Sequence, residues 1–456
     1  MISCDTIAAI ATPPGAGGIA IVRISGEGAF ATANAVFRAN CGRPLEEQRG
    51  FSARLGKAYS PEGELIDEAL ALVFHSPRSY TGEDAVEIMC HGGELPCREI
   101  LSAVCAAGAR AAARGEFTRR ACLNGRISLN EAEAVCELIN SASRQGERAA
   151  AALASGALSK KLDELKAEIL AMQAHLTACI DFPEEDVEEP DYAEFESRLG
   201  ALVSELEKLA GSYNLGADLI RGVPAVIVGS PNVGKSTLLN LLAGAEKALV
   251  TPIAGTTRDV LEQRISLGGT TLLLADTAGI RESEDPVEKM GIERALQRVE
   301  EASLIFAVFD SSRALDSDDL RLIESLRDRR AIAVVNKTDL PQALDSAPLK
   351  AAFGEPVFIS AREPQSLEVL DEAVARLIKT DSLDPNAPLL ATERQRESAL
   401  RALEFLKEAR EACAASLLDA GYAMLSQTLE ALSELKGENA SESVLDEVFS
   451  RFCVGK

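Results

Sequence analysis

The chain of 456 residues contains no tryptophan, and aromatic residues make up only 4% of it. Proteins that bind single-stranded nucleic acid unaided stack its bases on aromatic side chains, and such platforms are scarce here. Lys and Arg number 47 against 71 Asp and Glu, which gives a formal net charge of −24 at pH 7. This acidity argues against broad, unaided binding to a phosphate backbone. We therefore expect no DNA partner.

The sequence also lacks the ligands of a metal centre and the marks of export. It has three histidines and ten scattered cysteines without a C-x-x-C pair, a spread typical of reduced, mostly buried thiols. The N-terminus has no basic region of a secretory signal, and no apolar run approaches membrane-spanning length. These absences predict a cytoplasmic protein with no membrane partner.

One glycine-rich segment does carry chemistry: Gly229-Ser-Pro-Asn-Val-Gly-Lys-Ser-Thr237 fits G-x-x-x-x-G-K-[ST]. Backbone N–H groups of such a loop converge on phosphate oxygens, and its glycines permit the close approach. Lys235 can reach the β- and γ-phosphates, and Ser236 can hold Mg²⁺. The segment lies between a predicted buried strand, Val223–Val228, and a predicted helix, Ser236–Ala243. The pattern predicts a nucleoside triphosphate site.

Three further loops follow in the order typical of GTPases. Asp276-Thr-Ala-Gly279 ends the apolar strand Thr271–Ala275, where an acid can hold Mg²⁺ through water and a glycine N–H can meet the γ-phosphate. Asn336-Lys-Thr-Asp339 ends the predicted strand Ala331–Val335, and its aspartate can accept both N–H donors of guanine, which adenine does not offer. Ser360-Ala361, after a strand over 356–359, supplies the last base-side loop. Together the four elements predict a GTPase domain.

The regions on either side of this domain differ in pattern. Residues 1 to about 120 alternate short strands with helices, which predicts a compact α+β domain. The expected strands are Ile19–Ile24, Glu68–Phe74 and Ala85–Cys90, and the expected helices are Gly28–Arg38 and Gly93–Ala107. Later segments carry apolar residues at i, i+3 and i+4, which predicts amphipathic helices. These are Leu129–Ser143, Arg144–Ser155, Leu158–Cys179, Tyr192–Leu209, Arg394–Ser416, Gly421–Gly437 and Ser441–Phe452.

The arrangement of these regions predicts a multidomain α+β and α/β protein. The last residues, about 75 of them, are too few for a secure core of their own. Because domain termini tend to lie close together, a domain can be inserted into a host. We therefore expect an N-terminal domain over 1–120, a GTPase domain over 218–379, and one helical domain built from 121–217 and 380–456. The acidic break 181–191 is interpreted as a solvated turn.

Short motifs along the whole chain resemble one family, the tRNA wobble-uridine modification GTPases of the MnmE, or TrmE, type. The motifs are Ala11-Thr-Pro-Pro-Gly15, Val22-Arg-Ile-Ser-Gly26, Ser79-Tyr-Thr-Gly-Glu83, Cys90-His-Gly-Gly93, Gly115-Glu-Phe117, Ile253-Ala-Gly-Thr-Thr-Arg-Asp259 and Phe452-Cys-Val-Gly-Lys456. One departure is Ala16, where relatives often carry arginine.

The resemblance implies a fold and a reaction that composition and periodicity do not. It implies a tetrahydrofolate-binding-like N-terminal domain that forms a homodimer, a discontinuous helical domain with a C-terminal cysteine, and an inserted Ras-like P-loop GTPase. It further implies an FAD-containing partner of the MnmG type in a heterotetramer. Together they would add a carboxymethylaminomethyl group to C5 of the wobble uridine of certain tRNAs. The carbon would come from 5-formyl- or methylene-tetrahydrofolate.

The resemblance also assigns residues around the nucleotide. Together with the four loops, it implies GTP contacts from Asn232, Val233, Gly234, Lys235, Ser236, Thr237, Thr251, Pro252, Ile253, Ala254, Gly255, Thr256, Thr257, Asp276, Thr277, Ala278, Gly279, Asn336, Lys337, Asp339, Ser360, Ala361 and Arg362. Mg²⁺ would be held by Ser236 and Thr257. K⁺ would be held by Asn232, Thr251, Ile253 and Thr256, in place of an arginine finger.

Catalytic roles are implied for Lys235, Glu288 and Cys453. Ile280 stands where Ras-type enzymes place the glutamine that orients water, and the family's match for a water-orienting group is Glu288. Without the resemblance, Glu288 is equally an acid in a solvated loop. Cys453 is a small buried hydrophobe, a frayed tail thiol, or a reactive thiol whose ionisation the charge of Lys456 favours.

The residues that would contact folate are Arg23, Glu87, Arg126 and Lys456. A pterin ring presents a guanidine-like donor edge that suits a carboxylate such as Glu87, and the glutamate tail of folate suits arginine or lysine. Taken without the family, each is most simply a surface charge.

Two other functions compete with tRNA modification. A GTPase switch in ribosome or RNA assembly would usually append a basic RNA-binding module, which this acidic chain lacks. A folate-dependent methyltransferase with a vestigial GTPase fails because every nucleotide-contacting motif is intact. The sequence leaves open which tRNAs are modified and whether glycine or ammonium donates the nitrogen. It also leaves open how nucleotide state gates the reaction.

Overall fold

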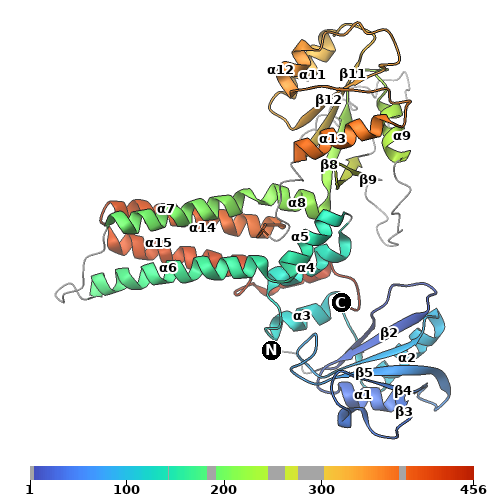
Figure 1. Cartoon of the computed structure of the whole chain (residues 1–456). Coiled ribbons are helices and arrows are strands. Elements are labelled where there is room, and N and C mark those ends of the chain that lie inside the picture. The colour runs from blue at the N-terminus through green and yellow to red at the C-terminus, as the bar shows by residue number, and fades with distance from the viewer. Residues whose placement is uncertain (1–4, 142, 182–191, 245–261, 276–301, 379–386) are drawn as a thin grey trace. The chain divides into compact units, whose positions relative to one another are not determined.

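The computed structural model describes residues 5–141, 143–181, 192–244, 262–275, 302–378 and 387–456 (Figure 1). It forms two compact units, one of Met1–Cys136 with Leu429–Lys456 and the other of Glu137–Thr428. Two helices, α4 (Leu129–Asn140) and α15 (Leu418–Lys436), run from one unit into the other. Each unit therefore contains segments that are distant in sequence.

The first unit is built on a seven-stranded sheet with the order β3-β4-β5-β6-β2-β1-β7. Its strands are β1 (Ile7–Ile10), β2 (Ile19–Ser25), β3 (Phe37–Ala39), β4 (Ser52–Tyr59), β5 (Leu65–Phe74), β6 (Ala85–His91) and β7 (Arg110–Ala111). Neighbouring strands are antiparallel, except that β1 and β7 are parallel. The N-terminal region is thus α+β, as the sequence predicts.

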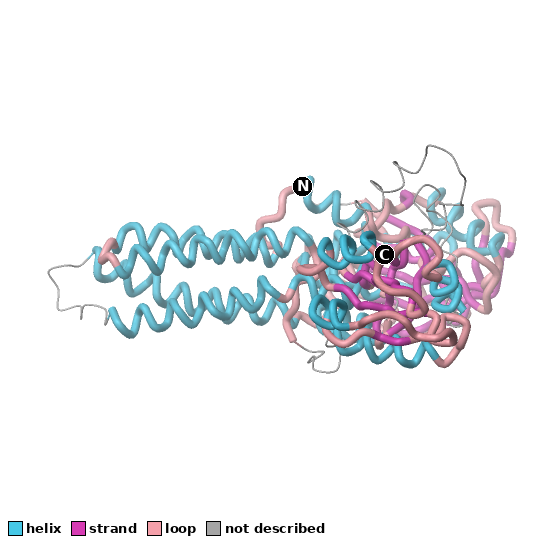
Figure 2. Tube along the Cα trace, turned by 90° about the horizontal axis from the view of Figure 1, so that it is seen from above, coloured by secondary structure: helices cyan, strands magenta, loops and turns pink. Residues whose placement is uncertain are grey.

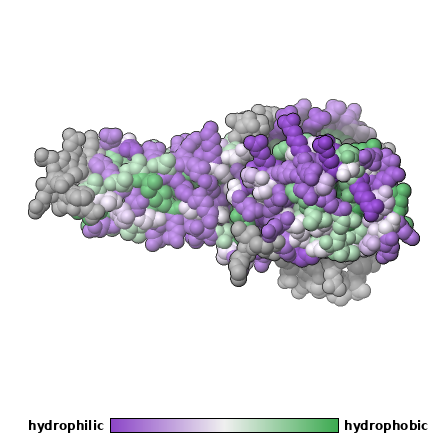
Figure 3. Space-filling view, turned by 90° about the horizontal axis from the view of Figure 1, so that it is seen from below, coloured by the Kyte–Doolittle hydropathy of each residue, from purple (hydrophilic) through white to green (hydrophobic). Residues whose placement is uncertain are grey.

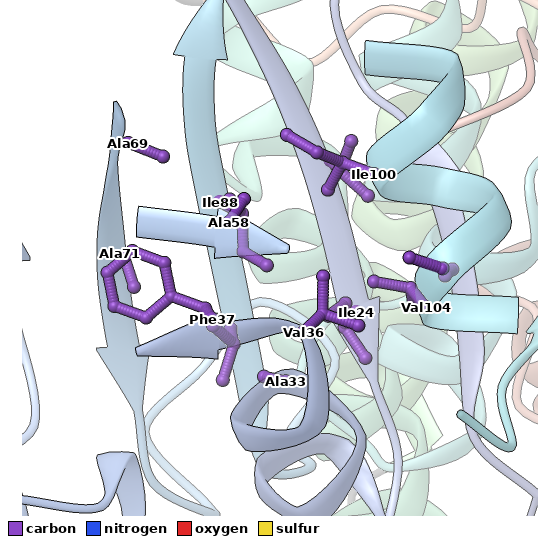
Figure 4. Close-up of a cluster of buried hydrophobic side chains, with 14 of the residues drawn as sticks. Ile24, Ala33, Val36, Phe37, Ala58, Ala69, Ala71, Ile88, Ile100 and Val104 are labelled. Atoms are coloured by element: carbon purple, nitrogen blue, oxygen red, sulfur yellow. The ribbon is translucent and has the colours of Figure 1, made fainter. Parts of the chain in front are cut away.

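Helices α1 (Ala29–Val36) and α2 (Glu94–Ala106) pack on one face of this sheet. Figure 4 shows Ile24 and Ile88 of the sheet beside Ile100 and Val104 of α2, all fully buried. Because side chains of a strand alternate between its faces, the neighbours of these residues point the other way. The opposite face carries exposed apolar side chains, including Ile19 at 63%, Leu55 at 48% and Leu70 at 40%.

The C-terminal segment completes the first unit. Helix α3 (Glu116–Leu123), the first part of α4 and helix α16 (Glu442–Ser450) pack around a small apolar cluster. Its buried members are Leu129, Ala132, Leu445, Phe449 and Phe452. Phe452, which directly precedes the terminal Cys-Val-Gly-Lys, is 2% exposed, so the cluster extends to the start of this terminal segment.

The second unit begins with a helical bundle. Its helices are α5 (Arg144–Ala154), α6 (Ala157–Asp181), α7 (Tyr192–Gly211), α8 (Tyr213–Arg221), α14 (Glu393–Ala414) and α15. Figure 2 shows the long helices running side by side. Lys407 of α14 pairs with Glu207 of α7 at 2.6 Å, and Gln173 of α6 donates to Ser426 of α15. Helices from before and after the GTPase segment therefore form one bundle.

The rest of the second unit is an α/β domain on a six-stranded sheet in the order β13-β12-β11-β8-β10-β9. The strands are β8 (Val223–Val228), β9 (Glu262–Leu267), β10 (Thr270–Ala275), β11 (Leu304–Asp310), β12 (Ala331–Asn336) and β13 (Val357–Phe358). The helices described are α9 (Lys235–Gly244), α11 (Ser317–Ser325), α12 (Ala347–Phe353) and α13 (Ser366–Ile378). Only β9 is antiparallel to its neighbour. This parallel sheet, buried on both sides, is the P-loop architecture that the motifs predict.

One predicted helix boundary is wrong. The helix expected over Gly28–Arg38 ends at Val36, because Phe37 has extended backbone (φ −115°, ψ 132°) and begins β3. The aromatic ring of Phe37 is 2% exposed and lies in the core beneath the sheet (Figure 4). Burial of this ring outweighs the helical pattern that precedes it.

The hydropathy of the surface agrees with the charge of the sequence. Figure 3 shows a mostly hydrophilic surface interrupted by separate hydrophobic patches. Within the described ranges, no helix combines the length and the apolar character needed to cross a membrane. In the same ranges, no group of three or more His, Cys, Asp or Glu side chains is arranged to hold a metal ion.

Candidate functional site

The phosphate loop lies between β8 and α9. Its second glycine, Gly234, has φ +100°, and a Cβ built there would lie 2.2 Å from Nδ2 of Asn336. Only glycine fits this conformation and this close approach. Lys235 Nζ donates to the carbonyl oxygens of Gly229 and Ser230, each at 2.9 Å, which holds the ammonium inside the loop.

The remaining loop residues divide into a buried anchor and exposed groups. Val233 is fully buried in the core of the domain, so it fixes the loop to the sheet. Asn232 is exposed at φ +63°, and Ser236 and Thr237 are exposed at the start of α9. Helix N-terminal N–H groups and hydroxyls that face solvent can bind an anion and its counter-ion.

Asn336 joins the phosphate loop to the base loops. Its side chain is 3% exposed, its Nδ2 donates to Val233 O, and its Oδ1 accepts from Ala361 N, both at 2.9 Å. The amide therefore braces two loops that are far apart in sequence. Because both Nδ2 and Oδ1 of Asn336 are bonded within the protein, this residue has a structural role in addition to the contact with guanine that the sequence predicts.

The other base-side residues gather around Asp339. Ser360 Oγ donates to Asp339 Oδ1 at 3.0 Å, and Arg362 lies 4.0 Å from the same carboxylate. Asp339 is nevertheless exposed, so its second oxygen can accept from a ligand. The structure thus brings Asp339, Ser360, Ala361 and Arg362 together, as expected for a base pocket.

Asp310 is a member of this site that sequence reasoning missed. Lys337, at φ +67°, donates from Nζ to Asp310 Oδ2 at 2.6 Å. Burial by itself would raise the pKa of Asp310, but hydrogen bonds from Lys337 and Ser312 outweigh it and hold that pKa below its usual value. Asp310 ends the apolar run of β11, and a polar residue at the end of such a run is the signal that could have identified it.

Several expected site residues lie outside the described residues. They are Thr251, Pro252, Ile253, Ala254, Gly255, Thr256, Thr257, Asp276, Thr277, Ala278, Gly279 and Glu288.

A second cluster of expected site residues lies in the first unit. Arg23 of β2 and Glu87 of β6 are directly paired across the sheet, and Arg23 Nε donates to Glu87 Oε1 at 2.8 Å. Both side chains are about a fifth exposed, at 21% and 18%. The guanidinium also lies 5.8 Å from the ring centre of Tyr80 and 5.6 Å from that of Phe117. Aromatic rings and a carboxylate therefore fix Arg23 in place.

The C-terminal tail ends at this cluster. Arg23 Nη1 donates to Gly455 O at 3.2 Å, across 432 residues of sequence. Val454 forms a β-bridge with Arg114, and Gly115 N donates to Cys453 O at 3.4 Å. These contacts bring the tail, with the exposed Cys453, onto the surface that holds Arg23 and Glu87.

Arg126 approaches the same surface from the other side. A Cβ built at Gly82 would lie 3.2 Å from Cγ of Arg126, so the Arg126 side chain packs against Gly82. Asn124 Nδ2 donates to Thr81 O at 2.7 Å and fixes the loop that also carries Tyr80. Arg126 thus packs on the loop whose Tyr80 ring lies 5.8 Å from the Arg23 guanidinium, and Lys456 follows directly after Gly455.

A buried ionic network supports the tail site, and the sequence did not reveal it. Arg120, with a side chain 6% exposed, pairs with Asp5 at 2.7 Å and with Glu83 and Glu116 at 3.2 Å. Glu83 also accepts from Ser25 Oγ at 2.7 Å. Burial would raise the pKa of Glu116, but its arginine partners Arg110 and Arg120 hold that pKa below its usual value. The network ties β1, β2 and the 79–83 loop together.

The other described thiols are less accessible than Cys453, with the exception of Cys41. Burial raises the pKa of Cys90 to about 11, and it raises the pKa of Cys105, Cys122 and Cys413 as well. Such thiols stay protonated and unreactive at neutral pH. Among the described cysteines Cys41 and Cys453 are exposed, Cys105, Cys122 and Cys136 are partly exposed, and only Cys90, Cys97 and Cys413 are buried, so fewer thiols are buried than the sequence predicts.

A substitution that adds one methyl group at Gly455 tests whether the C-terminal tail is docked as described. Gly455 has φ +92°, and a Cβ there would lie 2.4 Å from Ile10 O. We expect Gly455→Ala to release the tail and raise amide hydrogen exchange at Gly115, whose N–H donates to Cys453 O, by about tenfold or more, since strain of this kind costs on the order of 1–3 kcal/mol. Gly63→Ala is the matched control, with φ +88° and nothing within 4 Å of its Cβ position. Unchanged exchange in Gly455→Ala would contradict the docked tail.

Comparison with known proteins identifies the family of the chain. One family model, described as the GTP-binding protein TrmE N-terminus, matches residues 6–126, and another, the MnmE helical domain, matches residues 129–453. The tRNA modification GTPase MnmE of Symbiobacterium thermophilum is 43% identical over 99% of each chain. That of Heliobacterium modesticaldum is 42% identical, also over 99% of each chain.

Among solved structures, Era of Aquifex aeolicus aligns with 40% of this chain and 66% of its own at 26% identity, with a TM-score of 0.25. The relatives, by contrast, match from end to end, and the phosphate and base loops described above are intact. The chain therefore belongs to the MnmE family of tRNA modification GTPases, and it is a GTP hydrolase.

Proposed function

We propose that this GTPase modifies the wobble uridine of certain tRNAs at C5, together with an FAD-containing partner of the MnmG type, using a one-carbon unit from tetrahydrofolate. One observation carries the proposal: the terminal segment reaches Arg23 through Gly455 O at 3.2 Å, beside Glu87. That contact puts an exposed thiol, Cys453, on the surface that bears the candidate folate contacts.

The side chains on this surface suit folate chemically. Glu87 uses one carboxylate oxygen for Arg23, and its other oxygen can accept from the guanidine-like edge of a pterin. Arg126 and Lys456 can pair with the carboxylates of the glutamate tail. Folate, when bound, would supply the carbon that is transferred, while Cys453 is the nearest exposed nucleophile on the tail.

The nucleotide loops suit GTP with Mg²⁺ and K⁺. Ser236 follows Lys235 at the start of α9, so its hydroxyl can reach a magnesium ion beside the phosphates. Asn232 is exposed at the tip of the loop, and its side-chain oxygen can turn toward a monovalent ion. A cation held there would neutralise charge that develops between the β- and γ-phosphates, as a guanidinium does in other GTPases.

The open face of the N-terminal sheet supports a homodimer. Ile19, Leu55 and Leu70 expose apolar surface on the same side of neighbouring strands. Exposed contiguous apolar surface of this kind marks protein–protein contact in soluble proteins. A dimer formed there, with two copies of the flavoprotein, would give the heterotetramer.

The test is mass analysis of wobble nucleosides in tRNA from cells that lack the protein. We expect the carboxymethylaminomethyl group at C5 to disappear and to return when the gene is restored. Unchanged wobble nucleosides together with a ribosome-assembly defect would instead favour a GTPase switch in RNA assembly. Because the readout is chemical, it separates the two functions directly.

Guanine selection is tested by Asp339→Asn. An amide cannot accept both guanine donors as a carboxylate does, and losing a charge-assisted pair costs on the order of 1.5–3 kcal/mol. We therefore expect GTP to bind roughly 10–100-fold more weakly in calorimetry. Xanthosine triphosphate is the control ligand, since it has an acceptor where guanine has its amino donor and should gain affinity. Unchanged GTP affinity would show that Asp339 does not select the base.

A further inference from the structure

A hollow in the first unit lies between two turns that flank strands β4 and β5. Its volume is about 530 Å³, which falls within the range of small-ligand and nucleotide pockets. Its walls are Arg49, Gly50, Phe51, Ser52, His75, Ser76, Pro77 and Arg78. None of the residues assigned above to GTP or folate lines it.

The hollow is basic in a strongly acidic chain. Arg49 and Arg78 are both exposed, and neither forms an ion pair with any residue that the structure describes. Arg54, nearby on β4, donates to the neutral Gln48 Oε1 at 2.6 Å instead of to a carboxylate. One acid contacts the lining directly: Asp84 Oδ1 accepts from Ser76 N at 2.8 Å. Two unpaired guanidinium groups therefore remain to bind an anion.

An exposed aromatic ring stands beside these charges. Phe51 is 65% exposed and has φ +58°, a conformation that bulky residues rarely adopt. Its N–H donates to Val73 O at 2.8 Å, and its ring meets Phe74 edge to face at 5.6 Å. The ring thus has a fixed position with a free face. An aromatic face beside arginines is the composition that binds single-stranded RNA by stacking and by phosphate contact.

The hollow adjoins the tail site within the same unit. Ser76 Oγ donates to Gly82 O at 2.9 Å, and Gly82 packs against Arg126. A free anion would need only the arginines, whereas the exposed ring of Phe51 favours a ligand that has bases as well.

We propose that this hollow binds the single-stranded RNA next to the uridine that is modified, with Arg49 and Arg78 on phosphates and Phe51 stacked on a base. The proposal deepens the proposed function and rests on it. It assigns this chain a small RNA contact of its own.

The experiment measures binding of an anticodon stem-loop RNA, with uridine at the wobble position, to the full chain over a range of salt concentrations. We expect Arg49→Ala with Arg78→Ala to weaken binding about tenfold or more and to lower the salt slope by about 1.4, since each phosphate contact on a single strand contributes about 0.7. Phe51→Ala should weaken binding about tenfold with an unchanged slope, because stacking releases no counterions. Arg98→Ala is the matched control, an exposed arginine of α2 outside the hollow.

Three outcomes would overturn the proposal. One is wild-type chain that shows no salt-dependent binding to this RNA, and another is a double variant whose affinity and slope match those of the wild type. The third is a double variant that loses affinity for a polyglutamylated tetrahydrofolate analogue but not for the RNA, which would assign the arginines to the folate tail. GTP turnover and the thermal midpoint show that each variant is folded. Wobble-nucleoside mass tests the proposed function separately, so either idea can fail alone.

Discussion

Deletion of Cys453–Lys456 is expected to abolish tRNA modification while GTP hydrolysis survives. The deletion removes the β-bridge between Val454 and Arg114 and the hydrogen bond from Arg23 to Gly455 O. Phe452 and the other buried members of the C-terminal apolar cluster remain, so the first unit should stay folded. No residue of the phosphate or base loops is touched.

The same deletion should weaken binding of a tetrahydrofolate analogue. Loss of a charged contact from the Lys456 side of the site costs on the order of 1.5–3 kcal/mol, which is roughly 10–100-fold in affinity. Three measurements on the truncated protein test these expectations: folate binding by calorimetry, GTP turnover, and the mass of wobble nucleosides in tRNA. If the truncated chain modifies tRNA normally, Cys453 has no part in the reaction and the proposed site is in the wrong place.

Single thiol variants separate the role of the sulfur from that of the tail. Cys453→Ser keeps the tail and its backbone contacts, so it should bind the folate analogue normally and yet fail to modify tRNA. Cys41→Ser is the matched control, because Cys41 is the other exposed thiol among the described residues of the chain. Full activity of Cys453→Ser would leave the tail with a positioning role only.

Replacement of potassium by sodium is expected to lower kcat for GTP by about 10²-fold. Ile280 stands where other GTPases place glutamine, and the sequence offers no evident arginine finger, a group normally worth roughly 10³–10⁵ in rate. A monovalent ion supplies charge without directed hydrogen bonds, so we expect a smaller contribution. Rates are compared at equal ionic strength, because salt screens all charges alike.

Asn232→Ala should reproduce the loss in the presence of potassium. Its side chain is exposed at the loop tip, so truncation removes the proposed ligand oxygen without opening the core. Asn240→Ala, an exposed asparagine of α9, is the matched control and should hydrolyse GTP normally. Equal rates of GTP hydrolysis in potassium and in sodium would contradict the potassium proposal, regardless of the results with Asn232→Ala and Asn240→Ala.

Local pattern was enough to predict most of the elements that carry the nucleotide site. Strand β8 is found where it is predicted, over Val223–Val228, and α9 begins at Lys235, one residue before its predicted start. The phosphate loop and Asn336–Asp339 can be recognised because each is a short segment whose residue types must follow one another at fixed spacing. Long helices such as α6 and α7 are equally visible, since apolar residues repeat at helical period.

Local pattern missed four strands of the N-terminal sheet: the short strands β1, β3 and β7, and the eight-residue strand β4. Strands β1 and β7 contain four and two residues, too few to show alternation, and they are strands only because β2 and β1 pair with them. The end of α1 at Val36 is of the same kind, because Phe37 leaves the helix to fill the core. In each case a contact with another element decides the conformation.

The sequence by itself determined that this chain has a guanine-nucleotide site flanked by an α+β region and amphipathic helices. Those features depend on residues that are close together in the sequence. Only the tertiary structure decided which distant residues meet. The Asn336 side chain forms hydrogen bonds with Val233 and Ala361. Arg120 forms ion pairs with Asp5, Glu83 and Glu116. Arg23 donates a hydrogen bond to Gly455, near the other end of the chain. Periodicity reports which face of an element is buried, but it carries no information about the partner that buries it. Those pairings arise when the sheet and the helical segments close around their cores.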